Sequence, residues 1–209
     1  MHPLDLGMVL DNHGIGKVSD YRPYIKTFGE LRVKVIGIAA SLHAGSYINR
    51  LLEAICSELP PGVAFEAWQG LGEVPPYGPG PAPAVVRELL TLVEEADAIV
   101  LTAPEHSLLP PELDHALGWM SARGGLAGKH VAVMCASARA CGAMWAQAEL
   151  YKELMTAGAV VIGAELVISP VCPHFDDDGR LWARELRAQV REVVFQLCPA
   201  QIREPVLSG

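Results

Sequence analysis

Five short apolar segments alternate along the chain with longer segments in which apolar residues recur at helical spacing. The first apolar segment, residues 33–40, is rich in β-branched residues, which is typical of a strand buried on both faces. Leu51, Leu52 and Ile55 follow it at the spacing of a helix with one buried face. The same alternation predicts further strands at 63–68, 98–102, 130–135 and 160–169, and helices at 47–59, 84–95, 112–121, 143–156 and in a last segment that ends at Leu197.

This alternation of strands and helices predicts the fold class. Strands that are each followed by a helix pair in parallel, with right-handed crossovers that place helices on both faces of the sheet. We therefore expect an α/β protein with a five-stranded parallel sheet in the order 2-1-3-4-5. Small and polar residues follow strands one, three and four, and in this order the three loops meet at one edge of the sheet. A single crevice at that edge suits a mononucleotide cofactor.

The loop after the first strand, residues 41–49, has the composition of a phosphate-binding loop. Backbone N–H groups and the positive end of a helix dipole both point into a loop of this kind. Ser41 and Ser46 add hydroxyl donors, and Gly45 lets the backbone approach a ligand closely. The alternative interpretation is an ordinary capped turn between a strand and a helix, without a ligand.

Length and composition indicate one domain. The chain has 209 residues, of which 51% are hydrophobic, enough for one well-buried α/β core. Residues 31–200 hold the periodic segments, residues 1–30 are expected to form an N-terminal arm, and residues 201–209 form a tail. Residues 69–83 are rich in Gly and Pro, so we expect them to cross the surface as a loop.

Charge and cysteine content exclude several classes of function. A net charge of −8 would repel a nucleic acid or an acidic membrane surface, so neither is expected as a partner. No apolar run has the length of a membrane span, and the N-terminus lacks the basic and apolar regions of a signal peptide. The five cysteines are widely spaced and never form a CxxC pair, which favours reduced thiols in the cytoplasm. No metal site is expected, because cysteine and histidine pairs lack ligand spacing and Asp176-Asp-Asp178 is typical of a turn.

Several stretches match motifs of one known family. The stretch Ala40-Ser-Leu-His-Ala-Gly-Ser-Tyr-Ile-Asn49 is similar to the motif Gly-Ser-x-Arg-x-x-Ser-x-Asn, which follows the family's first strand. A second motif, Pro-Glu-Tyr-Asn followed by a proline and a helix ending near Ala-Leu-Asp-Trp, is matched by Pro104-Glu-His-Ser107, Pro110 and Ala116-Leu-Gly-Trp119. Further matches are Gly128-Lys129 before the fourth strand, Ser137 and Gly142 after it, and Phe175 to Leu181 before the last helix.

On these residues the chain resembles the NADPH-dependent FMN reductases, a flavodoxin-like family that includes azo-dye, quinone and chromate reductases and arsenical-resistance flavoproteins. The resemblance covers roughly residues 32–197 and leaves the first thirty residues unexplained. It implies a flavodoxin-like three-layer sandwich with bound FMN, and NADPH or NADH as the co-substrate. It implies no catalytic side chain, because the flavin carries the chemistry.

The chain departs from the family pattern in both motifs. His43 stands where the family has Arg, so a titratable group replaces a fixed positive charge. The other departures are Ala40 for Gly, Asn49 one residue late, His106 and Ser107 for Tyr and Asn, and Arg139 where the family usually has Gly.

The resemblance implies two groups of FMN-binding residues. The phosphate group would contact Ser41, His43, Ser46, the amides of Tyr47 and Ile48, and Asn49. The isoalloxazine ring would contact Pro104, Glu105, His106, Ser107 and Leu108, with Ser137, Arg139 and Gly142 on its opposite side. Arg139 near N1 and O2 of the ring would stabilise the anionic reduced flavin.

The reaction that the resemblance implies has two halves. NAD(P)H would give a hydride to the flavin, which would then give two electrons to a small acceptor: a quinone, an azo compound, free flavin or a metal oxyanion. A homodimer or homotetramer, in which neighbouring subunits complete each flavin site, is the implied assembly. Two alternatives stay open: a flavodoxin-like electron carrier that does not oxidise NADPH, and a non-catalytic protein of the family, either one that binds flavin without turnover or one that has lost its flavin and serves a binding role. Aerobic NADPH oxidation and the colour of the purified protein distinguish them.

Overall fold

The computed structural model describes most of the segment that carries the periodic pattern. The described residues are 25–26, 33–43, 45–103, 110–136, 143–163, 167–168, 174–176 and 178–197.

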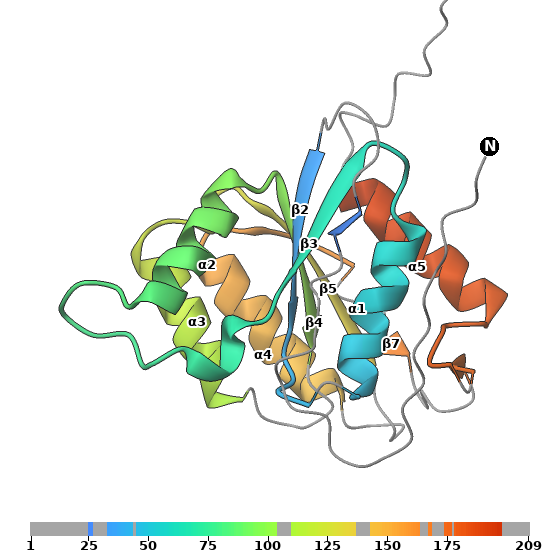
Figure 1. Cartoon of the computed structure of the whole chain (residues 1–209), viewed down its shortest axis with the longest axis horizontal. Helices are drawn as coiled ribbons and strands as arrows, with labels where there is room; N and C mark the ends of the chain where they lie inside the picture. The colour runs from blue at the N-terminus through green and yellow to red at the C-terminus, as the bar shows by residue number, and fades with distance from the viewer. Residues whose placement is uncertain are drawn as a thin grey trace, which may run out of the picture.

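A parallel sheet forms the centre of the molecule (Figure 1). The strands lie side by side in the order β1-β3-β2-β4-β5-β6, and β7 also pairs with β5. All pairings are parallel except β1 with β3. The strands are β1 Ile25–Lys26, β2 Val33–Ala39, β3 Val63–Trp68, β4 Ala98–Ala103, β5 His130–Ala136, β6 Val160–Ile162 and β7 Val167–Ile168. The five predicted strands therefore take the predicted order 2-1-3-4-5, which confirms the flavodoxin-like fold class.

Helices cover both faces of the sheet, as the strand–helix alternation predicts. Figure 1 shows α1 and α5 on one side and α2, α3 and α4 on the other. A short 3-10 helix, η2 Gly70–Glu73, follows β3. The α-helices are α1 Tyr47–Glu58, α2 Ala84–Glu95, α3 Pro111–Ala122, α4 Ala143–Thr156 and α5 Arg184–Leu197.

Each face of the sheet has its own hydrophobic core, and β4 shows the division. Val100 packs into the core under α1 and α5, whereas the next residue, Leu101, packs into the core under α2, α3 and α4. Both side chains are fully buried. Apolar residues at successive positions of the central strands are thus explained by burial on two faces rather than one.

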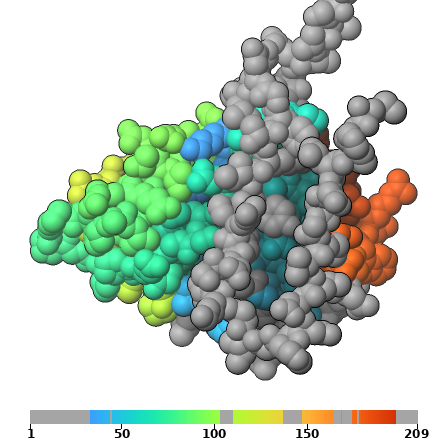
Figure 2. All heavy atoms as spheres, in the orientation of Figure 1, coloured from blue at the N-terminus to red at the C-terminus, as the bar shows by residue number. Residues whose placement is uncertain are grey.

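The Pro-rich loop after η2 is attached to α3. The indole Nε1 of Trp119 donates a hydrogen bond to the Pro75 carbonyl oxygen at 2.9 Å. The ring of Tyr77 packs edge-on against Trp119, with 5.0 Å between ring centroids. The ring nitrogen Nδ1 of His115 lies 3.0 Å from the Val74 carbonyl oxygen. The predicted loop, residues 69–83, is thus found only after η2, which forms its first part, and with α2 it makes the projecting end of the molecule on the left of Figures 1 and 2.

Two features of the sheet differ from the predicted pattern. The fifth strand, predicted as continuous over 160–169, is divided into β6 and β7. Gly163 directly follows β6 with a φ of +68°, a left-handed conformation that a strand cannot continue. The second difference is β1, a short antiparallel strand that pairs with β3 within the stretch expected to form an aperiodic arm.

Candidate functional site

The candidate phosphate loop begins directly after the pairing of β2 with β4 ends. The Ala40 N–H donates to the Thr102 carbonyl oxygen at 3.1 Å, which continues the ladder between β2 and β4 by one residue. Ala103 in turn lies level with Cys135 of β5. The carboxyl ends of β2, β4 and β5 therefore lie at one edge of the sheet, where an open α/β sheet binds ligands.

Hydrogen bonds between residues close in sequence connect the loop to the first turn of α1. The His43 N–H donates to the Ser41 hydroxyl oxygen at 3.3 Å, and the Ser46 N–H donates to the His43 carbonyl oxygen at 3.0 Å. Ser46 is the N-cap of α1, and its hydroxyl oxygen accepts a hydrogen bond from the Asn49 N–H at 3.3 Å. The hydroxyl oxygens of both serines thus accept hydrogen bonds from backbone N–H groups within this segment.

Asn49 joins the helix to the loop through its side chain, which is 8% exposed. Its Nδ2 donates to the His43 carbonyl oxygen at 2.6 Å and to the Ser46 hydroxyl oxygen at 3.2 Å. The resemblance implied Asn49 as a contact to the phosphate. In the structure both hydrogen bonds of its amide Nδ2 stay within the loop, and a contact of Asn49 with the phosphate stays a prediction.

The electrostatics of the loop favour an anion. Residues 41–52 include no Asp or Glu, and the first turn of α1 has no acidic residue. Helices commonly place acidic residues there, because the helix dipole is positive at that end. No atom of the described residues lies within 4 Å of the position that a Cβ of Gly45 would take, and the side chain of His43 is exposed. The loop is therefore open to an anionic group and free of negative charge.

A buried hydroxyl, that of Thr102, lies near the loop, and no described residue hydrogen-bonds to it. Thr102 is 0% exposed, and its Oγ1 has no hydrogen-bond partner within the described part of the chain. It pairs with Ala39 in register, and strand alternation places its side chain on the same face as Val100, the face covered by α1. An unsatisfied buried hydroxyl costs about 1–3 kcal/mol. Together with the two serines and the helix N-terminus, it makes a donor set that fits a phosphate-bearing cofactor.

The remaining residues implied as FMN contacts lie outside the described residues, so their geometry stays a prediction. They follow strands that are described: one group comes directly after β4 and the other directly after β5. These residues are Pro104, Glu105, His106, Ser107, Leu108, Ser137, Arg139 and Gly142.

The comparison with known proteins decides the family. The sequence model of the NADPH-dependent FMN reductases matches residues 33–171, more than half of the chain. The chain belongs to the NADPH-dependent FMN reductase family. The protein is therefore a flavoprotein oxidoreductase that uses FMN and NAD(P)H, and the predicted cofactors and enzyme class are confirmed.

Individual relatives agree with this assignment. The chain is 32% identical over 169 residues to the NAD(P)H-dependent FMN reductase of Pseudomonas aeruginosa, covering 75% of this chain and 90% of the relative. FerB, a flavoenzyme NAD(P)H:(acceptor) oxidoreductase from Paracoccus denitrificans, superposes with a TM-score of 0.70 at 23% identity, covering 79% of this chain and 97% of FerB. An oxidoreductase from Corynebacterium diphtheriae superposes with a TM-score of 0.65 at 13% identity, covering 84% and 100% of the two chains. These two structures support the fold.

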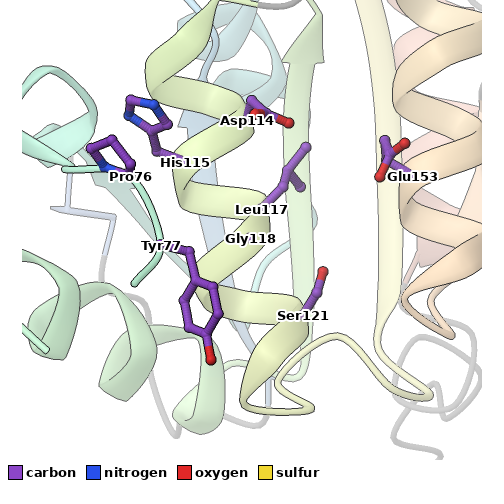
Figure 3. A pocket seen from close by; sticks show the side chains of 8 residues that line it. All are labelled: Pro76, Tyr77, Asp114, His115, Leu117, Gly118, Ser121 and Glu153. Atoms are coloured by element: carbon purple, nitrogen blue, oxygen red, sulfur yellow. The ribbon is translucent and has the colours of Figure 1, made fainter. Parts of the chain in front are cut away.

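Sequence reasoning missed a hollow between α3 and α4, with a volume of 420 Å³. Figure 3 shows the residues that line it: Pro76 and Tyr77 come from the Pro-rich loop, Glu153 comes from α4, and the others come from α3 between them. The signal in the sequence was the pair of small residues Gly118 and Ser121 on α3, one turn apart. The lining residues are Pro76, Tyr77, Asp114, His115, Leu117, Gly118, Ser121 and Glu153.

The described residues contain neither a cluster of metal ligands nor a helix suited to a membrane. No group of three or more His, Cys, Asp or Glu side chains there is placed to hold a metal ion. Among the same residues, none of the helices has both the length and the apolar character that crossing a bilayer requires.

Proposed function

We propose that this oxidoreductase passes two electrons from NAD(P)H, by way of FMN, to a small acceptor of the quinone, azo, free-flavin or metal-oxyanion type. Bound FMN supplies the hydride and electron transfer chemistry. The chain supplies binding, orientation and electrostatics, and none of its side chains is required as an acid or a base. The observation that carries the proposal is the braced loop without acidic residues at the N-terminus of α1.

The loop is proposed to hold the FMN phosphate. Ser41 and Ser46 would donate hydroxyl groups, His43 would add a side-chain donor, and the amides of Tyr47 and Ile48 would contribute the positive end of α1. Asn49 would act as the brace that keeps these donors in place, since its amide is bonded to the loop itself. The absence of acidic residues from the loop supports this assignment.

The second group of residues is proposed to hold the isoalloxazine ring. They follow β4 and β5, whose carboxyl ends lie level with each other beside the phosphate loop. Arg139 is proposed to stabilise negative charge near N1 and O2 of the ring. The group comprises Pro104, Glu105, His106, Ser107, Leu108, Ser137, Arg139 and Gly142.

The visible spectrum of the purified protein, with and without added FMN, tests the first half-reaction. We expect bands at about 375 and 450 nm that NADPH or NADH bleaches in the absence of oxygen. Each acceptor class is then added anaerobically to the reduced protein, and return of the 450 nm band identifies the acceptor. Failure to take up FMN would contradict the phosphate-loop assignment. Slow or absent bleaching by both nucleotides would favour the electron-carrier alternative.

The assembly is proposed to be a homodimer or homotetramer. Tyr151 and Met155 lie one turn apart on α4 and are 41% and 49% exposed, so that helix carries an apolar strip at its surface. Sedimentation of the wild type and of a Tyr151→Asp, Met155→Asp double variant tests this. We expect the variant to sediment as a smaller species. The matched control is Phe195→Asp, which changes a residue 40% exposed on α5 on the other face of the sheet.

The compartment is proposed to be the cytoplasm. The five cysteines are widely spaced and form no CxxC pair, which is usual for thiols in a reducing compartment. Alkylation of the denatured protein without a reductant, followed by mass measurement, tests this. We expect all five cysteines to be modified.

A further inference from the structure

Within the part of the chain that the structure describes, Arg50 lies at the first turns of α1 and forms no ion pair with a carboxylate. Its guanidinium carbon lies 5.4 Å from the centroid of the Tyr47 ring. No hydrogen bond or ion pair of its guanidinium group occurs within the described part of the chain. An arginine carries five N–H donors in a planar fork that matches the oxygens of a phosphate, and none of the described residues uses these donors.

The position of this charge follows from helix geometry. Side chains of a helix tilt toward its N-terminus, so the guanidinium group of Arg50 lies nearer to the start of α1 than its own Cα does. The contact with Tyr47, the first residue of the helix, places it at the level of the first turn. Ser46, the N-cap of the phosphate loop, directly precedes that turn.

The surroundings hold Arg50 in this place. A Cβ on Gly179 would lie 3.3 Å from both Cδ and Nε of Arg50, so the arginine packs closely on the glycine backbone. The ring of Tyr47 packs in turn on Phe175, with 5.8 Å between ring centroids. Burial raises the pKa of Glu53, and the charge of Arg50 partly opposes this rise. Arg50 therefore acts on its neighbourhood as a positive charge, although no carboxylate lies within ion-pair distance of it in the described residues.

The loop itself has no permanent positive charge. Residues 41–49 contain no Lys or Arg, and the single residue there that can become cationic is His43. We propose that Arg50 binds the phosphate group of FMN and supplies the fixed positive charge that the loop lacks. This rests on the proposed function, in which the loop holds that phosphate.

Paired titrations with FMN and riboflavin test the proposal, because riboflavin has the same ring and lacks the phosphate. Quenching of flavin fluorescence gives the Kd of each for the apoprotein. In Arg50→Gln we expect the Kd of FMN to rise about tenfold to a hundredfold, since one charge-assisted hydrogen-bond pair is lost, while the Kd of riboflavin stays constant. Arg50→Lys should recover part of the FMN affinity, because it keeps the charge and loses the planar fork.

Arg123→Gln is the matched control, because it removes an exposed arginine from the C-terminal cap of α3. It should leave both Kd values unchanged. Equal weakening of FMN and riboflavin binding in Arg50→Gln would overturn the proposal in favour of a structural role, and so would unchanged binding of both. A wild type that does not distinguish FMN from riboflavin would overturn the phosphate loop, and Arg50 with it. A wild type that prefers FMN, with the full preference kept in Arg50→Gln, would overturn the role of Arg50 alone.

Discussion

The side-chain amide of Asn49 donates a hydrogen bond of 2.6 Å to the backbone carbonyl oxygen of His43. This bond connects the first turn of α1 to the middle of the phosphate loop across six residues of chain. Both ends are part of the candidate site, so the bond couples the stability of the helix start to the shape of the loop.

Asn49→Ala should therefore affect folding and cofactor binding together. The change removes a buried donor and leaves the His43 carbonyl oxygen without that bond. We expect the free energy of unfolding to fall by about 1–3 kcal/mol and the Kd of FMN to rise. Urea unfolding and FMN titration measure the two effects.

The matched control for this prediction lies at the other end of the same helix. The hydroxyl of Ser57 donates to the Glu53 carbonyl oxygen at 3.0 Å in an exposed position. Ser57→Ala should change stability by no more than about 0.5 kcal/mol and leave FMN binding unchanged. An Asn49→Ala variant that behaves like Ser57→Ala would show that the bond does not hold the loop.

Sequence reasoning located the loop but not the role of Asn49. A buried strand, small polar residues and a helix start follow from periodicity and composition, which are local properties of the chain. The direction of the Asn49 side chain depends on how the loop folds back, and spacing alone does not fix that. The unpartnered hydroxyl of Thr102 was missed for the same reason, because its position beside the loop follows from the register of β4 with β2.

Periodicity predicted the central strands of the sheet, but it did not predict β1 at one edge or the break after β6 at the other. Central strands are long and buried on two faces, so their composition is distinctive. The pairing of β1 with β3 involves only Ile25 and Lys26, too few residues to form a periodic pattern. The break after β6 depends on Gly163, where a Cβ would meet the side chain of Val193 on α5. That contact joins segments far apart in sequence.

Gly37 should be intolerant of a side chain. It lies in β2, and a Cβ there would overlap the ring of Phe65 and approach Cδ1 of Leu52 to 2.9 Å. We expect Gly37→Ala to lower the free energy of unfolding by about 1–3 kcal/mol, since the buried neighbours must shift. Gly78→Ala is the control, because no described residue comes within 4 Å of its Cβ position. Equal denaturation midpoints for the two variants would contradict the close packing of Phe65 on β2.

Gly179 should matter for cofactor selectivity as well as for stability. Its φ is +78°, so an alanine there is strained, and its Cβ would press on Arg50. Gly62 has a similar φ of +88° with nothing within 4 Å of its Cβ position. We expect both alanine variants to lose about 1 kcal/mol of stability, and Gly179→Ala alone to lose part of the preference for FMN over riboflavin. If Gly62→Ala reduces the preference for FMN over riboflavin as much as Gly179→Ala does, the loss comes from general destabilisation and not from Arg50.

The carboxylate of Glu58 on α1 forms ion pairs with two arginines of α5. Its Oε1 accepts a hydrogen bond from Arg187 Nε at 2.5 Å, and its Oε2 accepts hydrogen bonds from Arg191 Nη2 at 2.5 Å and Nε at 3.1 Å. The Glu58 side chain is 5% exposed, so loss of one partner would leave a buried charge. Burial alone would raise the pKa of this carboxyl group, but the hydrogen bonds and charges of Arg191 and Arg187 outweigh burial and hold the pKa below 4.5.

This lowered pKa predicts a specific loss of stability in acid. At a pH well above 4.5, the ordinary pKa of a glutamate, the carboxylate is charged in both states, and its contribution to stability is fully present. As the pH falls through this ordinary value, the unfolded chain binds the proton first, so the free energy of unfolding decreases until the folded carboxyl group is also protonated. Glu58→Gln should be less stable than the wild type by about 1–3 kcal/mol at pH 7, and this difference should shrink as the pH falls.

Urea unfolding at several pH values measures this difference. The control is Glu88→Gln on the exposed face of α2, whose stability should stay parallel to that of the wild type at every pH. If the free energies of unfolding of Glu58→Gln and the wild type instead differ by the same amount at pH 3 and pH 7, the effect of Glu58 does not come from its charge.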